Sequence, residues 1–157
     1  MSEKTWEECL FEGDVRQVSK DTKKSDSLKR TAEGRIKFFN NQQINEENAN
    51  YIFEGHYTSI VEMLHSLTIS KGYNVSNHIC IGCYLRDVLK RDDSYRLFDD
   101  LRYKRNSLVY YGNKMDFETA ITKAQLKKIK KQKIILLLQQ LFSPKINFFS
   151  RGFLQDF

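Results

Sequence analysis

The chain has 157 residues, of which 40% are hydrophobic and 29% charged, and its formal net charge is +6 at pH 7. These values describe one globular domain with a single core and exclude an intrinsically disordered chain. One proline and seven glycines are too few for a turn-rich β fold, so the composition favours helices. The basic balance permits an anionic partner such as nucleic acid but does not require one.

The N-terminal half is predicted to contain three helices. A weak apolar pattern covers residues 5–18, and a highly charged segment predicts a second helix over 21–40. The third helix has the clearest signals: Asn45 before two glutamates is typical of a helix start, and an apolar stripe continues to Lys71. Gly72 then provides a natural C-terminal stop for this helix.

The C-terminal half is predicted to contain three more helices. Residues 74–77 are expected to be a short connection, a fourth helix follows it, and a fifth helix reaches Gly112. The last helix is expected over 116–142, where a Ser-Pro pair ends it because proline disfavours helix in the preceding residue. We therefore predict one all-α bundle of about five to six helices over 1–142. The tail, 143–157, has no clear period and is compatible with packing on the bundle or with pairing to a partner.

Cysteine spacing and apolar runs bear on the compartment. Cys9, Cys80 and Cys83 are too few and too scattered for a disulfide framework. The last two have the CxxC spacing of a redox or half-zinc site, yet their apolar neighbours favour packing in a buried helix. We expect a cytoplasmic protein without a secretory signal. The longest apolar run, Ile134 to Leu138, is too short to cross a membrane.

The three histidines give no metal-binding pattern. His56 and His65 are nine residues apart, whereas two ligands on one helix face need a spacing of three or four. His56 lies near an apolar stripe and His78 at a helix start, and both are interpreted as structural. No metal and no cofactor are expected.

The segment from Leu101 to Gly112 contains the strongest functional signal. Arg105 falls on the apolar stripe of the fifth predicted helix, four residues after Leu101 and three before Leu108. Its guanidinium cannot lose its proton and needs partners for its N–H donors. Two interpretations are open: a carboxylate in the core pairs with Arg105, or Arg105 faces a seam or cleft and binds an anion.

Three segments of the chain share a pattern with a known family. One is a long helix before a glycine–tyrosine turn, the next is that turn with a following serine and histidine, and the third is the arginine segment. Together they resemble the HEPN superfamily, in particular its prokaryotic single-domain members, between Asn48 and Gly112. The matching residues are Tyr51 to Leu64, then Lys71-Gly72-Tyr73 with Ser76-Asn77-His78, then Arg105-Asn106 with Tyr110 and Tyr111-Gly112.

This resemblance implies a small helical bundle that forms a homodimer. Many HEPN proteins are metal-independent endoribonucleases that use an arginine and, a short gap later, a histidine. Arg105 takes the arginine position, Asn106 the polar position after it, and Tyr110 the histidine position. Tyrosine titrates at about 10 and histidine at about 6.5, so a tyrosine is a poor proton acceptor at neutral pH. It still donates a hydrogen bond to phosphate, so binding survives this substitution more easily than catalysis.

Two functions follow from these residues. The first is a module that binds RNA or a nucleotide around Arg105 and Asn106 and is a weak or lapsed metal-independent endoribonuclease. Arg102 and Tyr111 would extend its binding surface; the alternatives are a solvated charge for Arg102 and a packing role for Tyr110 and Tyr111. The second is a non-catalytic interaction protein, the helical partner of a nucleotidyltransferase in a toxin–antitoxin-like pair. The tyrosine that such partners modify in some family toxins maps onto Gly112, so that site is not matched.

A lysine-rich segment precedes the apolar run near the C-terminus. Six lysines between residues 123 and 133 are either a solvated helix surface or a phosphate-binding face. The run that follows, Ile134 to Leu138, is apolar on every face of a helix and would therefore be buried. In so small a bundle a subunit interface is a natural place for it.

Overall fold

The computed structural model describes residues 4–110 and the side chains of residues 4–108. The predicted last helix at 116–142, the tail at 143–157 and Tyr111 lie outside the described residues, as does the side chain of Tyr110. The prediction of one domain over 1–142 therefore stays a prediction.

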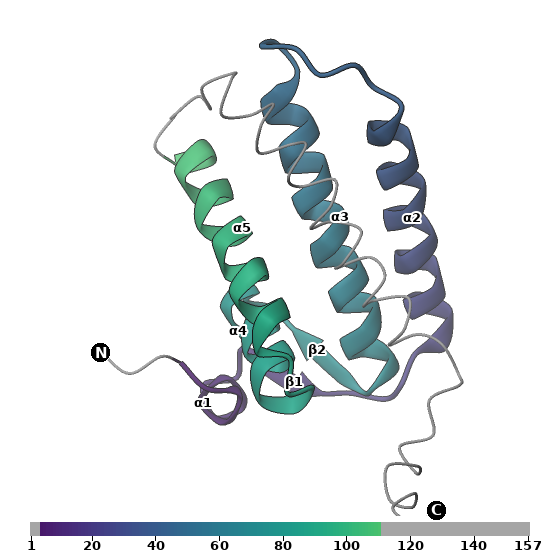
Figure 1. Cartoon of the computed structure of the whole chain (residues 1–157). Coiled ribbons are helices and arrows are strands. Elements are labelled where there is room, and N and C mark those ends of the chain that lie inside the picture. The colour runs from purple at the N-terminus through teal and green to yellow at the C-terminus, as the bar shows by residue number, and fades with distance from the viewer. Residues whose placement is uncertain (1–3, 111–157) are drawn as a thin grey trace, which may run out of the picture.

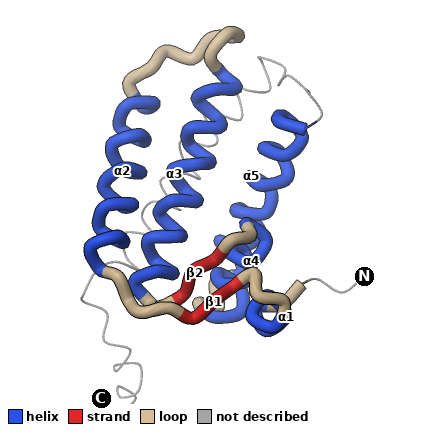
Figure 2. Tube along the Cα trace, turned by 180° about the vertical axis from the view of Figure 1, so that it is seen from behind, coloured by secondary structure: helices blue, strands red, loops and turns tan. Residues whose placement is uncertain are grey.

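The described part of the chain is an all-α fold with one very small sheet, which confirms the predicted fold class (Figure 1). Helix α3 lies between α2 and α5, and the short elements gather at one end of these three helices (Figures 1 and 2). Strand β1 pairs antiparallel with β2 at that end, with Val15 opposite Val75. The elements are α1 (Trp6–Phe11), β1 (Val15–Gln17), α2 (Thr22–Asn40), α3 (Ala49–Ser70), β2 (Tyr73–Val75), α4 (His78–Cys83), the π-helical turn η1 (Tyr84–Val88) and α5 (Asp92–Tyr110).

Local sequence signals set several of these boundaries. The Asp21 carboxylate accepts a hydrogen bond from the Lys24 N–H at 2.8 Å and so caps α2, as the predicted start at residue 21 requires. Gly72 has a φ of +88°, a conformation that favours glycine, and it ends α3 as predicted. The Asn77 side chain accepts from the Ile79 N–H at 2.9 Å and caps α4.

Two predicted helix boundaries are wrong. The first helix ends at Phe11 rather than at Val18, because Gly13 turns the chain with a φ of +80° and the residues after it pair with β2. The third helix begins at Ala49 rather than near Asn45. Asn45 and Asn48 each accept the other's backbone N–H at 2.9 Å, and this reciprocal pair forms a turn before the helix.

The core forms around α3, which is covered by α2 on one side and by α4 and α5 on the other. Residues from all these elements join one buried cluster, including Met63 and Leu67 of α3, Ile81 of α4 and Phe98 of α5. Because α3 is covered on several sides, its sequence is apolar over most of its circumference and carries few charges. Within residues 4–110 no helix is long and apolar enough to cross a lipid bilayer.

Close packing of α2 on α3 depends on a glycine. A Cβ atom at Gly55 of α3 would lie 1.9 Å from Cε2 of Phe39 on α2. The Phe39 ring is held between Phe38, with ring centroids 5.3 Å apart, and His56, at 5.6 Å. The ring would therefore have to leave both contacts to make room for a methyl group.

We expect Gly55→Ala to destabilise the protein by on the order of 1 kcal/mol. Overpacking costs about 1–3 kcal/mol, and alanine recovers about 1 kcal/mol of helix propensity. Gly34→Ala in α2 is the matched control, because no atom lies within 4 Å of its added Cβ. That control should stabilise the protein by about 0.5–1 kcal/mol. Urea unfolding followed by circular dichroism measures both, and equal stabilisation by the two alanines would contradict this account.

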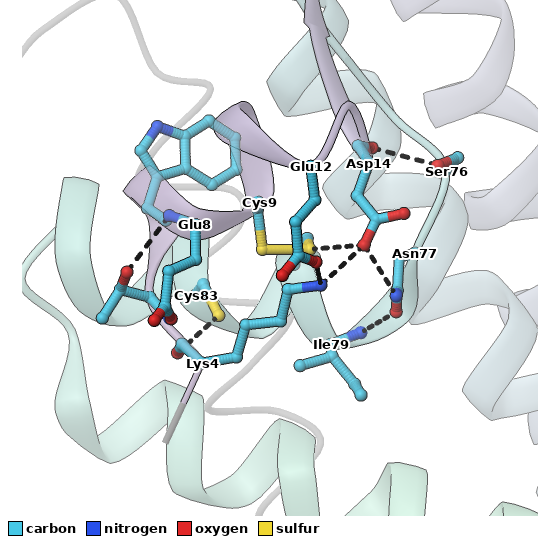
Figure 3. Close-up of a disulfide and its surroundings, with 12 residues drawn as sticks. Lys4, Glu8, Cys9, Glu12, Asp14, Ser76, Asn77, Ile79 and Cys83 are labelled. Atoms are coloured by element: carbon cyan, nitrogen blue, oxygen red, sulfur yellow. Dashed lines mark hydrogen bonds and ion pairs between the residues drawn. A yellow bond between two sulfur atoms is a disulfide. The ribbon is translucent and has the colours of Figure 1, made fainter. Parts of the chain in front are cut away.

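A disulfide joins Cys9 of α1 to Cys80 of α4 (Figure 3). The sequence predicted no disulfide framework and favoured simple packing for Cys80, and this bond shows that the interpretation is wrong for Cys80. The two bonded cysteines lie 71 residues apart in sequence, and only the packing of α1 on α4 brings their sulfur atoms together. Cys83 is a buried thiol that donates to the Lys4 carbonyl at 3.2 Å, and for this residue the packing interpretation is confirmed.

Ionic and hydrogen-bonding contacts add to the disulfide in holding the N-terminal segment to the start of α4 (Figure 3). The Lys4 ammonium lies 2.7 Å from the Asp14 carboxylate and 2.5 Å from that of Glu12. Asp14 also accepts from the Asn77 amide at 3.1 Å. The hydrogen bonds from Lys4 and Asn77 lower the pKa of Asp14, and the bond from Lys4 has the larger effect. Asp14 thus connects the turn before β1 to the residue that caps α4.

Loss of the disulfide should lower the free energy of unfolding by about 2–4 kcal/mol, since it closes a long loop in the unfolded chain. Wild type is expected to lose this stability in reductant, whereas Cys9→Ser should be insensitive to reductant. Peptide mapping after alkylation of free thiols should recover the Cys9 and Cys80 peptides as a linked pair. Recovery of all three cysteines as alkylated thiols would contradict the pairing. The same mapping on protein taken from its host also tests the compartment, because disulfides persist mainly in oxidising environments.

Candidate functional site

The site is centred on Tyr57, a residue of α3 that the sequence did not single out. Its side chain is 3% exposed. The phenol oxygen lies 2.8 Å from Nδ1 of His78, at the start of α4. One face of the ring stacks on Phe98 of α5, with centroids 6.1 Å apart and planes 14° from parallel. The Arg105 guanidinium carbon lies 5.9 Å from the ring centroid, within the range of a cation–π contact. Tyr57 therefore connects three helices.

Arg105 lies on the apolar stripe of α5, as predicted. Phe98 and Leu101 of this stripe are buried, and Leu108 packs against the core from a partly buried position. Nη2 of Arg105 lies 3.6 Å from Oε1 of Glu54, a carboxylate that is 41% exposed. The predicted carboxylate partner thus exists, but it lies at the rim of the core. Such a rim pair contributes little to stability, so it leaves the guanidinium able to exchange this partner for another anion.

The other candidate residues lie on the same helix. Arg102 donates from Nη2 and Nε to Oδ1 of Asp99, at 2.6 and 2.9 Å, and is 22% exposed. Asn106 follows Arg105 directly and is partly buried. Tyr110 ends α5, but its side chain, like the whole of Tyr111, lies outside the described residues. The structure therefore places Arg102, Arg105 and Asn106 together on α5.

Charge patterning explains why this arginine-rich segment is helical. Asp92 and Asp93 occupy the first turn of α5, where negative charge is favoured by the helix dipole. Asp92 then pairs with Arg96 one turn later, and Asp100 pairs in the same way with Lys104. Pairs at this spacing stabilise a helix by about 0.2–0.5 kcal/mol each.

His78 is the functional candidate that sequence interpretation missed. From the sequence it was assigned a structural role, because it lies at a helix start and at no metal-ligand spacing from another histidine. Burial lowers its pKa, and the positive charges of Arg105 and Arg102 lower it further. The pKa of His65 on α3 is lowered by burial, by His78 and by Lys24. Burial raises the pKa of Tyr57 to about 12. At neutral pH the site therefore combines two guanidinium groups with a neutral imidazole and a neutral phenol.

The only sequence signal for His78 was its place in the family-like turn that follows Gly72. Nothing local in the sequence links it to Arg105, because the two residues lie on different helices and both contact Tyr57 of a third. Among the described residues, no group of three or more histidine, cysteine, aspartate or glutamate side chains is arranged to hold a metal ion. The chemistry available from these residues is anion binding and proton transfer.

Comparisons with known proteins do not assign the chain to a family. No family model, no curated protein and no solved structure matches it. The HEPN resemblance therefore stays a prediction from the sequence.

Stability should fall as the pH drops below about 6.5, the usual histidine pKa. His65 and His78 have lowered pKa values in the folded protein, so the unfolded chain binds protons first as the pH falls. The two neutral histidines contribute their full stability at pH values above the histidine pKa of the unfolded chain. This stability is lost as the pH falls from that value to the lower pKa of the folded protein. Urea unfolding at several pH values between about 7.5 and 5 measures the slope of the free energy of unfolding against pH. His78→Asn should reduce it, and an unchanged slope would contradict the assigned environment of His78.

Proposed function

We propose that this chain is a HEPN-like module that binds RNA or a nucleotide around Arg105 and Asn106. The main support for this proposal is that Arg105 and a neutral His78, on two different helices, both contact Tyr57. A phosphate offers the oxygen acceptors that a guanidinium fork binds in pairs. Arg102 lies one turn earlier on α5 and extends the positive charge toward the neighbouring phosphate of the bound RNA.

The acidic partners of the two arginines are compatible with this role. Glu54 is 41% exposed and Asp99 is 43% exposed, so water can solvate each carboxylate when a phosphate replaces it. A fully buried partner would have to be left unpaired in the core, at a cost of about 3–5 kcal/mol. The half-exposed carboxylates keep the arginines ordered in the free protein without blocking exchange.

The resemblance extends the proposal to a weak or lapsed metal-independent endoribonuclease, which acts as a homodimer. The cytoplasmic location expected from the cysteine count stays a prediction, and the Cys9–Cys80 disulfide argues against it, because disulfides persist mainly in oxidising compartments. The residues expected to form the subunit interface, Ile134 to Leu138, lie outside the described residues.

The alternative is a non-catalytic helical partner of a nucleotidyltransferase. Large side chains exposed on the described surface favour a protein interaction: Phe38 is 61%, Tyr51 71% and Tyr103 73% exposed. Isolated exposed aromatic residues are common on monomeric proteins, so the anion-binding function has the stronger support.

Arg105→Ala should weaken binding of a labelled single-stranded RNA about tenfold, which corresponds to about 1.4 kcal/mol of lost charge-assisted hydrogen bonding. The slope of log Kd against log salt should fall by about one. Arg96→Ala is the matched control, because it removes the same charge from α5 at a side chain that is 79% exposed and pairs with Asp92 along the helix surface. Fluorescence anisotropy over a salt series measures both variants.

Arg105→Lys separates charge from geometry, because lysine keeps the charge but loses the planar fork. It should recover the salt slope and only part of the affinity. Circular dichroism checks that each variant is folded. Equal binding by wild type, Arg105→Ala and Arg96→Ala would overturn the proposed anion site.

A further inference from the structure

His78 has the properties of a proton acceptor held beside an anion site. Its Nδ1 atom is engaged by the Tyr57 hydroxyl at 2.8 Å, and the imidazole is partly buried. The hydrogen bond at Nδ1 orients the ring and leaves Nε2 for a second partner. Three histidines occur in the chain and none follows His78, so no histidine is present within or after the arginine segment.

We propose that His78 is the proton-accepting residue of this site and that Tyr57 positions it, for cleavage of RNA by attack of a 2′-hydroxyl on the adjacent phosphorus. The inference rests on the proposed RNA-binding function and adds the residue that performs the chemistry. In this arrangement Nδ1–H donates to the Tyr57 oxygen, and Nε2 carries the free lone pair.

The step balances without metal or cofactor. Nε2 of His78 accepts the 2′-hydroxyl proton, the 2′-oxygen forms a bond to phosphorus, and the bond from phosphorus to the 5′-oxygen breaks. The departing 5′-oxygen takes a proton from a water molecule, and the hydroxide left behind removes the proton from Nε2 of His78, which restores the neutral imidazole. The products are a 2′,3′-cyclic phosphate and a free 5′-hydroxyl. Arg105 and Arg102 offset the negative charge on the phosphate oxygens.

The charges around His78 suit this role. Tyr57 and His65 face His78 from α3, and Arg102 and Arg105 face it from α5. Asp99 is the carboxylate partner of Arg102, and Glu54 is that of Arg105. Burial, and then the charges of Arg105 and Arg102, lower the pKa of His78 in the free protein, so its imidazole is neutral and able to accept a proton at pH 7. A bound phosphate adds negative charge beside the ring and favours the imidazolium as it forms.

Other candidates for the acceptor fit less well. Tyr57 is neutral at pH 7, because burial raises its pKa to about 12. His56 contacts the Phe39 ring of α2, with centroids 5.6 Å apart, on the side of α3 that faces away from α5. His56 therefore serves as a control, with the same side-chain chemistry outside the site.

The test uses the full chain, EDTA and a 5′-labelled single-stranded oligoribonucleotide. The amide of His78→Asn occupies the place of Nδ1 and can keep the Tyr57 hydrogen bond, but it has no group at Nε2. We expect it to bind RNA within about threefold of wild type and to cleave at least roughly 100-fold more slowly, the scale of general base catalysis. His78→Gln provides a second variant should the asparagine protein fail to fold. His56→Gln should cleave like wild type.

Two further readouts separate catalysis from structure. Tyr57→Phe keeps the ring against Phe98 and Arg105, so RNA binding should persist while kcat falls and the acid limb of the pH profile moves. Wild-type product should end in a 2′,3′-cyclic phosphate, and an oligonucleotide with 2′-deoxyribose throughout should resist cleavage. No cleavage by wild type, or cleavage by folded His78→Asn at the wild-type rate, overturns the role of His78. The anisotropy comparison of Arg105→Ala decides the binding function separately.

Discussion

The buried hydroxyl of Tyr57 is the constraint on which the site depends. A phenol buried between helices requires a hydrogen-bond partner, because an unsatisfied buried polar group costs about 1–3 kcal/mol. His78 is that partner, so the start of α4 must lie against the middle of α3. The same ring stacks on Phe98 and lies beneath Arg105, which sets the distance between α3 and α5. One side chain therefore determines how three helices meet.

The N-terminal segment supports this arrangement from the other side of α4. The Cys9–Cys80 disulfide and the hydrogen bond from Asn77 to Asp14 both involve residues within two positions of His78. The pairing of β1 with β2 adds a third connection just before α4. Because α4 is only six residues long, its own helical hydrogen bonds would not hold it in place. The contacts made by residues 4–17 thus stabilise the position of His78.

Electrostatics give the site its character. Two arginines in one site would repel each other in the free protein, and Glu54 and Asp99 reduce this repulsion from half-exposed positions. Their partial exposure limits the stability that each pair contributes and keeps the guanidinium groups available to a stronger acceptor. His78 remains neutral because burial and both arginines oppose its protonation. The negative charge of a bound anion would favour the protonated form of His78, so anion binding is linked to proton transfer.

The sequence alone determined the features that depend on neighbouring residues. The apolar stripe of α5 with Arg105 on it and the end of α3 at Gly72 were predictable, because each follows from the residues a few positions away. Tertiary structure decided the rest: the Cys9–Cys80 bond, the strand pair, and the approach of His78 and Arg105 through Tyr57. These contacts join residues far apart in the chain. Their existence depends on how whole helices pack, which no local pattern of residues encodes.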